Sequence, residues 1–256
     1  MSAGLPIFTY HRLFTGASDI SATDPAEAFY AISESSFEKH LQYLRSNGFQ
    51  TVSPQEFLLG RVPAKSVMLT FDDGWSSDFE IALPLLRHYG FTAVFFLCVD
   101  FIERPGFVDW QQIEQLRSAG MSLQCHGLLH RDYSMLPQEE ARQELEAARL
   151  VLERNIESPV PYLAMPGGFA SQTAYQAGFD AGFQAIFNSE QAVARPGKIV
   201  RRFVLRKNTT QIDFEKLANR DWKYLARSSA LHLATSAAKT ALGTARYEGL
   251  KQRIWR

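Results

Sequence analysis

The chain has 256 residues, with 27 Lys and Arg against 27 Asp and Glu, and only two cysteines. This length allows a single domain with one large α/β core. The charge balance gives no electrostatic reason to expect nucleic acid as a partner, and two cysteines make no disulfide framework. Residues 1–6 lack the basic and apolar regions of a signal peptide, and no apolar run reaches the roughly eighteen residues of a membrane-spanning helix. The sequence therefore predicts a cytoplasmic protein.

Strand and helix signals alternate in the first third of the chain. Residues 5–10 have the apolar pattern of a buried strand that ends at His11, and the polar residues after it predict a loop through Ala31. Apolar residues at helical spacing then predict a helix that ends at Asn47-Gly48. The next expected elements are a strand over residues 49–52, a short helix that begins at Ser53, and a second strand over residues 66–71.

The same alternation continues to about residue 205. The expected helices cover residues 75–89, 109–119, 137–155 and 174–177, the last one stopped by Gly178. The expected strands cover residues 92–97, 121–124, 162–165, 184–187 and 200–205. About seven such units without a sequence repeat predict a parallel α/β barrel, although periodicity alone does not separate a barrel from a doubly wound sheet.

Two adjacent acids follow the strand over 66–71, in the sequence Thr-Phe-Asp-Asp-Gly-Trp at 70–75. Because Gly74 turns the backbone next, Asp72 and Asp73 should lie at the C-terminal end of their strand, where α/β barrel enzymes carry their chemistry. Adjacent acids are also common in turns and at helix N-caps, so this pair alone does not establish a site.

A second motif, Cys-His-Gly-Leu-Leu-His at 125–130, changes that balance. His126 and His130 are four residues apart, so a helical turn would place both imidazoles on one face. Together with one carboxylate they would make a three-ligand metal site that keeps one position open.

These motifs, in this order, resemble the polysaccharide deacetylase family, which has the NodB-homology fold and forms carbohydrate esterase family 4. The resemblance extends from about Pro6 to about Leu205 and is closest in pattern to the poly-N-acetylglucosamine deacetylase-like branch. It implies a distorted, incompletely closed (β/α)7 TIM-like barrel. It also implies that Asp73, His126 and His130 bind one divalent metal ion and that Asp72 is the catalytic base. Oxygen and imidazole ligands suit Zn²⁺, and Co²⁺, Ni²⁺ or Fe²⁺ would fit the same set.

The resemblance assigns three further residues. The segment 163–169 aligns with the family's third motif, in which the residue after the proline, here Gly167, donates its backbone N–H to the oxyanion. Similar deacetylases carry a Tyr-His near the N-terminus, so His11 is the predicted acid for the leaving amine. The base-orienting arginine would come from the late strand, where the alternation of side chains favours Arg202 over its neighbour.

The sequence also departs from the family pattern. Gly127 replaces a Ser or Thr whose hydroxyl helps to hold the loop, Ala164 replaces the arginine of the third motif, and the family's late histidine has no counterpart in residues 203–205. Trp75 and Asp24 are expected to be structural.

Residues 220–256 have eight Lys and Arg against two acids and predict a basic extension of two amphipathic helices that is not an independent domain. We expect these helices to pack on a barrel formed by residues 1–219, and docking to an anionic membrane is the alternative.

The function implied is metal-dependent N-deacetylation of N-acetylhexosamine units in a polysaccharide or glycan precursor. The expected location is the cytoplasm, with the inner face of the membrane as a natural place for a lipid-linked precursor. A carbohydrate-binding relative without activity and a deformylase or other amidase are the alternatives.

Overall fold

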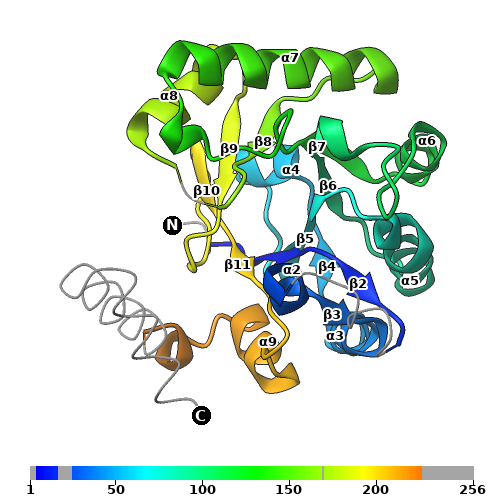
Figure 1. The fold of residues 1–256 in the computed structure, drawn as a ribbon. Helices are drawn as coiled ribbons and strands as arrows, with labels where there is room; N and C mark the ends of the chain where they lie inside the picture. Colours follow the sequence, from blue (N-terminus) through cyan, green and yellow to red (C-terminus); the bar gives the residue numbers. More distant parts are fainter. Residues whose placement is uncertain (1–3, 17–24, 169, 227–256) are drawn as a thin grey trace. The chain divides into compact units, whose positions relative to one another are not determined.

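The computed structural model describes residues 4–16, 25–168 and 170–226. The chain divides into two compact units, Met1–Glu215 and Lys216–Arg256. The first unit contains a sheet of parallel strands that is nearly closed into a barrel, with helices around it (Figure 1). Most of the predicted basic extension lies outside the described residues, so its helices and the domain boundary at residue 219 stay predictions. Within the described residues, no helix combines the length and the apolar character needed to cross a bilayer.

The barrel sheet contains nine strands, all paired in parallel. Their order is β10-β9-β8-β7-β6-β5-β1-β11, and β4 pairs with β5 off this path. Their bounds are β1 Ile7–Tyr10, β4 Gln50–Thr51, β5 Ser66–Asp73, β6 Val94–Leu97, β7 Ser122–Cys125, β8 Tyr162–Ala164, β9 Ala185–Asn188, β10 Ile199–Arg201 and β11 Phe203–Val204. A separate two-stranded sheet pairs β2 (Leu13–Phe14) with β3 (Ile32–Ser33).

The single strand predicted over 200–205 is two short strands in the structure. Arg202 separates them, and they lie at opposite ends of the sheet: β10 pairs with β9, whereas β11 pairs with β1 through Phe8 and Phe203. The chain therefore passes from one open edge of the sheet to the other at a single residue. This confirms the predicted incompletely closed barrel and explains why Arg202 is fully buried.

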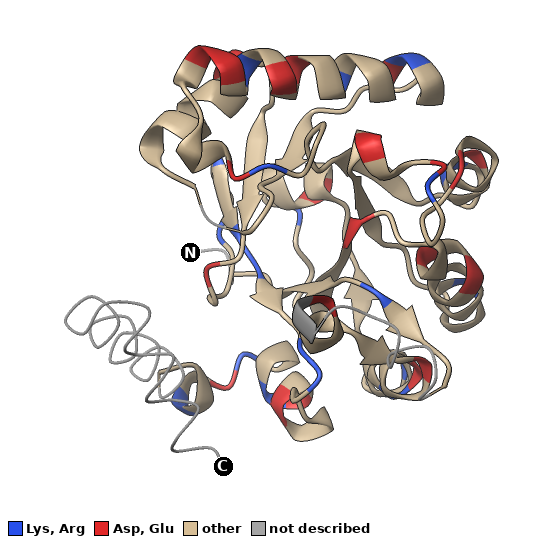
Figure 2. Cartoon of the chain, in the orientation of Figure 1, with Lys and Arg blue, Asp and Glu red and all other residues tan. Residues whose placement is uncertain are grey.

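Most of the helices lie around the outside of the sheet (Figure 1). Their bounds are α2 Pro25–Tyr30, α3 Glu34–Ser46, α4 Pro54–Leu58, α5 Leu83–Tyr89, α6 Trp110–Ser118, α7 Gln138–Ile156, α8 Gln172–Asp180 and α9 Gln211–Ala218, with a π-helical turn, η1, at Asp78–Ala82 and 3-10 turns, η2 and η3, at Val99–Phe101 and Tyr133–Met135. Helix α4 does not lie on the outside, because its Phe57 belongs to the same buried core cluster as Phe96 and Phe187 (Figure 1). Capping boxes at Ser53 and Asp109 start α4 and α6, as their sequences favour. Acids and bases alternate along the outer helix α7 (Figure 2), where Arg142 pairs with Glu139 and Glu146.

Two local predictions were wrong. The segment predicted as a loop through Ala31 contains the helix α2 and the strand β2, which are too short for periodicity to identify. Gly178 does not stop its helix, because α8 continues to Asp180. A side chain at Gly178 would lie only 2.7 Å from Ile186 Cδ1, so the glycine allows close packing of the helix on the sheet.

The core near β1 contains a buried histidine. The rings of Tyr10, Phe71 and Phe95 stack across β1, β5 and β6 with centroids 5.2 and 4.9 Å apart. Behind them, a hydrogen bond of 3.0 Å joins Tyr10 Oη to His40 Nδ1, and the His40 ring stacks on Phe214 at 4.0 Å. Burial lowers the pKa of His40 from 6.5 to about 4, so the imidazole is neutral in the folded protein at neutral pH.

We expect His40 to make the fold sensitive to acid. The unfolded chain binds a proton at His40 below about pH 6.5 and the folded chain only below about pH 4, so stability falls as the pH drops through this window, by about 3 kcal/mol in total. His40→Gln should remove that part of the loss in urea unfolding measured between pH 7 and 4. His88→Gln, at an exposed position, is the control, and an unchanged pH slope in His40→Gln would contradict the prediction.

Candidate active site

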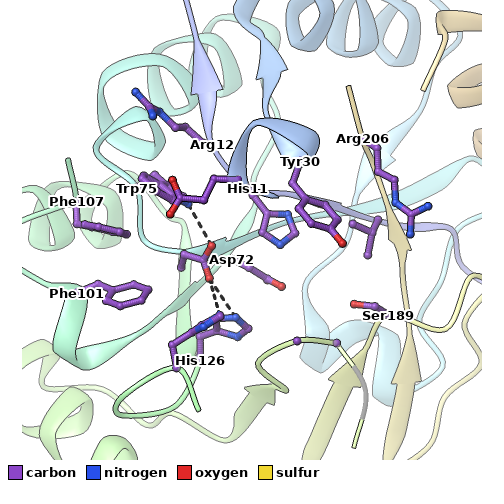
Figure 3. A pocket seen from close by; sticks show the side chains of 16 residues that line it. His11, Arg12, Tyr30, Asp72, Trp75, Phe101, Phe107, His126, Ser189 and Arg206 are labelled. Atoms are coloured by element: carbon purple, nitrogen blue, oxygen red, sulfur yellow. Dashed lines mark hydrogen bonds and ion pairs between the residues drawn. The ribbon is translucent and has the colours of Figure 1, made fainter. Parts of the chain in front are cut away.

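The C-terminal ends of the parallel strands meet at one rim and bring together residues that are distant in the sequence. Strand β5 ends with Asp72 and Asp73, β7 leads into His126, and β1 leads into His11. The register places Asp73 opposite Leu97, which is in turn opposite Cys125, so the acids and the first histidine lie at one level of the barrel. A cavity of about 290 Å³ opens at this rim (Figure 3), and it is lined by all of the predicted site residues except Arg202.

Asp73, His126 and His130 form a compact group of potential metal ligands. Their donor atoms all lie within 4.8 Å of one another, and Asp73 Oδ1 is 3.2 Å from His126 Nε2 and 3.3 Å from His130 Nε2. Despite this proximity, Asp73 Oδ1 is buried and has no well-oriented hydrogen bond within the described residues. A carboxylate oxygen and two imidazole nitrogens that face one another in this way fit one divalent cation such as Zn²⁺.

The first histidine of this group is oriented from behind by the main chain. His126 Nδ1 lies 2.9 Å from the carbonyl oxygen of Ala164, the last residue of β8. When Nδ1 carries the proton and donates it to this carbonyl, the lone pair of Nε2 is free for a metal ion. The backbone at position 164 thus has a role in the site although the family's arginine side chain is absent there.

The two histidines do not lie on a helical turn, as their spacing alone would allow. Residues 126–130 form a loop in which Gly127 has φ of 83° and His130 has φ of 52°. Both values belong to the left-handed region, which is incompatible with an α-helix of L-residues. The grouping of His126 with His130 therefore depends on the path of this loop rather than on helical periodicity.

Tyr133 and Glu144 hold the loop over 126–130, which we call the histidine loop. Tyr133 Oη accepts a hydrogen bond from Leu128 N–H at 3.3 Å and donates one to Glu144 Oε1 at 3.1 Å. The same Glu144 oxygen accepts from Leu129 N–H at 3.2 Å. A Cβ at Gly127 would come within 2.5 Å of Tyr133 Oη, so the tyrosine hydroxyl occupies the space of the missing Ser or Thr side chain.

Sequence reasoning missed this support. Glu144 lies in α7, whose other acids are more exposed, yet its side chain is only 7% exposed and turns inward to the histidine loop. No local signal distinguishes Glu144 from the other acids of α7, since its partners are eleven to fifteen residues away.

Arg202 and Asp72 form a buried, two-pronged ion pair. Arg202 Nη1 and Nη2 donate to Asp72 Oδ1 and Oδ2 at 2.7 and 2.8 Å, and the two side chains are 0% and 4% exposed. Arg202 Nε also donates to the Asn188 carbonyl at 3.2 Å. Burial raises the pKa of the Asp72 carboxyl, but Arg202, with His126 and His11, lowers it by more, so the pKa is lowered overall and Asp72 is ionised at neutral pH.

Asp73 is also held ionised, by different neighbours. Burial raises the pKa of Asp73, yet His126 and His130 together bring it well below its usual value. The pKa of His130 responds in the opposite direction: burial lowers it, and Asp73 reverses that effect and raises it. The adjacent acids are thus divided between an arginine and a pair of histidines.

His11 and Gly167 lie on the wall of the same cavity. His11 packs against Tyr30, with ring centroids 5.0 Å apart, and its buried Nδ1 has no hydrogen-bond partner within the described residues. Burial lowers the pKa of His11, and Asp73 and Asp72 offset this only in part. Gly167 has φ of 72°, which a glycine adopts readily after Pro166. The structure thus brings all seven predicted residues together, and their roles stay predictions.

The Trp75 side chain, expected to be structural, lies at the candidate site. Its ring lines the cavity and stacks on Phe107 with centroids 4.4 Å apart, and its Nε1 donates to Asp73 Oδ2 at 3.1 Å. Phe101 packs on the other side of Phe107 at 4.6 Å and on His130 at 5.6 Å. These rings form an aromatic wall beside the candidate metal ligands (Figure 3). Asp24, the other residue expected to be structural, lies outside the described residues.

Comparisons with known proteins identify relatives of this chain. Residues 60–186 match the family model described as polysaccharide deacetylase. The protein YxkH of Bacillus subtilis (strain 168) is 25% identical over 75% of this chain and 67% of its own length. A poly-beta-1,6-N-acetyl-D-glucosamine N-deacetylase of Staphylococcus aureus (strain MSSA476) is 23% identical over 65% of this chain. The chain spans 64% of the length of that second relative.

Solved structures share the fold. IcaB from Ammonifex degensii superposes with a TM-score of 0.73 at 27% identity and covers 84% of this chain and 97% of its own. The Streptococcus pyogenes deacetylase PplD, solved in complex with acetate, has a TM-score of 0.77 at 20% identity and covers 85% of this chain and 99% of its own.

The support of the histidine loop predicts a measurable effect on metal binding. Tyr133→Phe removes the hydroxyl that joins Leu128 N–H to Glu144, and we expect metal affinity to fall about tenfold or more, as for other groups that position metal ligands. Competition with a chromophoric chelator would measure the affinity. Tyr89→Phe, which removes an exposed hydroxyl bound to Glu38, is the control. Wild-type affinity in Tyr133→Phe would show that the loop does not need this support.

Proposed function

Because this chain carries a polysaccharide deacetylase domain, as its motifs indicated, we propose that it is a metal-dependent N-deacetylase that removes acetyl groups from N-acetylhexosamine units of a polysaccharide or glycan precursor. The family's members hydrolyse amide bonds of polysaccharides. The name of the Staphylococcus aureus relative, a poly-beta-1,6-N-acetyl-D-glucosamine N-deacetylase, supports the substrate class.

One observation carries the proposal. A three-residue ligand group, Asp73 with His126 and His130, lies beside a second carboxylate, Asp72, that an arginine keeps ionised. Asp72 is a buried carboxylate beside a second acid, and burying such a charge is costly unless a metal ion or a positively charged group pairs with it. Arg202 removes that cost and leaves Asp72 available as a base.

Asp73, His126 and His130 would hold the ion, and a divalent cation there would supply Lewis acidity, which for Zn²⁺ lowers the pKa of water from about 15.7 to about 7. Asp72 takes the proton from the water that attacks the acetyl carbonyl. Arg202 fixes both oxygens of Asp72, so the base has one orientation before the substrate arrives.

Gly167 and His11 complete the reaction. Gly167 N–H donates a hydrogen bond to the oxygen that gains negative charge when water adds to the carbonyl carbon. The carbon–nitrogen bond then breaks, acetate leaves, and protonated His11 gives its proton to the amine. The proton that Asp72 took from the water passes back through solvent, so that Asp72 is ionised and His11 protonated again for the next turnover. Because burial lowers the pKa of His11, its protonated form is a stronger acid than an ordinary imidazolium and gives up its proton readily.

The proposal predicts the product. The purified full chain, supplied in turn with Zn²⁺, Co²⁺, Ni²⁺ or Fe²⁺, should release acetate from N-acetylglucosamine oligosaccharides, and mass spectrometry should show the loss of one acetyl group. Chelation should abolish the release and fresh metal should restore it. Sugar binding without acetate release across a broad glycan panel would overturn the proposal, and release of formate from a formylated sugar alone would identify a deformylase.

The two adjacent acids should respond differently to the same substitution. Asp72→Asn should keep the fold and the metal ligands, with a loss of stability because buried Arg202 loses its charged partner. It should lower turnover by about 10² to 10⁴, because a positioned base contributes that much. Asp73→Asn should lose metal, because a neutral amide replaces the charged ligand. Metal content by mass spectrometry and acetate release together test this division. Equal metal loss in both variants would contradict it.

A further inference from the structure

The cavity has two chemically different ends. The aromatic wall formed by Trp75, Phe107 and Phe101 lies on one side of the acids and histidines, and Arg206 lies on the other, beyond His11 and Tyr30 (Figure 3). A substrate whose amide sits at the central group can therefore contact both ends.

Arg206 is held in place by its neighbours. It follows β11, and its backbone N–H donates to Thr209 Oγ1 at 3.0 Å. Its guanidinium lies 5.4 Å from the ring centroid of Phe29, in α2. The next residue, Lys207, donates its N–H to the Phe29 carbonyl at 3.0 Å, so α2 and the segment after β11 are joined at this point.

The charge of Arg206 has no acidic partner in the described part of the chain. Its Nε is buried without a hydrogen bond, and no ion pair joins the guanidinium to a described carboxylate. Glu27 is the other acid that lines the cavity besides the two catalytic-site aspartates, and it does not pair with Arg206. By contrast, Arg201 and Arg202, on the preceding segment, pair with Glu190 and Asp72.

A half-buried guanidinium loses part of its hydration, and here no described carboxylate replaces the lost water contacts. This location is therefore unfavourable unless a ligand supplies an anion. Guanidinium groups bind carboxylates and phosphates with two parallel hydrogen bonds. Nε belongs to one of the guanidinium edges that make such pairs, and here it is the atom left without a partner.

We propose that the substrate is an N-acetylated sugar that carries an anionic group, phosphate or carboxylate, and that Arg206 binds this group. This inference rests on the proposed deacetylase function and narrows its substrate class. Arg206 binds the oxyanion at one end of the cavity, the aromatic wall packs against the apolar part of the ligand at the other, and the acetamido group lies between them at Asp72 and Asp73.

Steady-state kinetics of acetate release by the metal-loaded full chain test the inference. The substrates are N-acetylglucosamine 1-phosphate, a disaccharide of N-acetylglucosamine and glucuronic acid, and neutral methyl N-acetylglucosaminide. We expect KM to be about tenfold lower or more for at least one anionic substrate than for the neutral one, since a charge-assisted hydrogen bond contributes that much. The two anionic substrates show whether phosphate or carboxylate is preferred.

Arg206→Gln should raise KM for the preferred anionic substrate about tenfold, with little change in kcat, and Arg206→Lys should recover part of the loss. Arg201→Gln, which removes an exposed arginine paired with Glu190, is the matched control and should keep the anionic preference. Equal KM values for all three substrates in the wild-type chain, or an anionic preference that survives Arg206→Gln, would overturn the inference.

A binding measurement separates this inference from the proposed function. Calorimetry with metal-loaded Asp72→Asn measures affinity for the same three sugars with turnover strongly reduced. An anionic sugar should bind Asp72→Asn more tightly than the neutral sugar does, and this difference should disappear in the double variant that also carries Arg206→Gln. That result would support the role of Arg206 even if the wild-type chain released no acetate. Equal binding of charged and neutral sugars would refute it even if the deacetylase activity were present.

Discussion

The buried ion pair between Arg202 and Asp72 connects the architecture of this protein to its chemistry. Arg202 lies where the chain passes between the two open edges of the sheet, and it contacts the end of β9 through the Asn188 carbonyl and β5 through Asp72. Removing one partner of such a pair costs about 3–5 kcal/mol, because the other charge stays buried. The requirement to keep this pair intact therefore holds the barrel edges and Asp72, the proposed catalytic base, in one fixed arrangement.

The adjacent acids can act separately because the backbone changes direction between them. Asp72 still belongs to the regular strand, whereas Asp73 has φ of 82° and is followed by Gly74 with φ of 86°. A non-glycine residue in the left-handed region is strained, and such strain is commonly found at functional sites. Here it turns Asp73 toward His126 and His130 while Asp72 faces Arg202. Two like charges are thus neutralised by two different sets of neighbours.

Support for the site comes from parts of the chain that carry no recognisable motif. The Ala164 carbonyl orients His126, and Tyr133 with Glu144 holds the histidine loop. Both arrangements occur at positions where the sequence departs from the family pattern, at Ala164 and at Gly127. The departures do not leave the site without support, because Arg202 pairs with Asp72 and the Tyr133 hydroxyl occupies the space beside Gly127.

Local signals in the sequence determined much of this protein. Continuous apolar runs identified the parallel strands, and the acid pair and histidine pair identified the family and the candidate metal ligands. The tertiary structure alone decided which distant residues meet. It divided the late strand at Arg202, replaced the expected helical turn between His126 and His130 with a loop, and brought Trp75 and Glu144 to the site. Periodicity and motifs describe neighbours in sequence, whereas Arg202 meets Asp72 across 130 residues, and only the closure of the barrel brings them together.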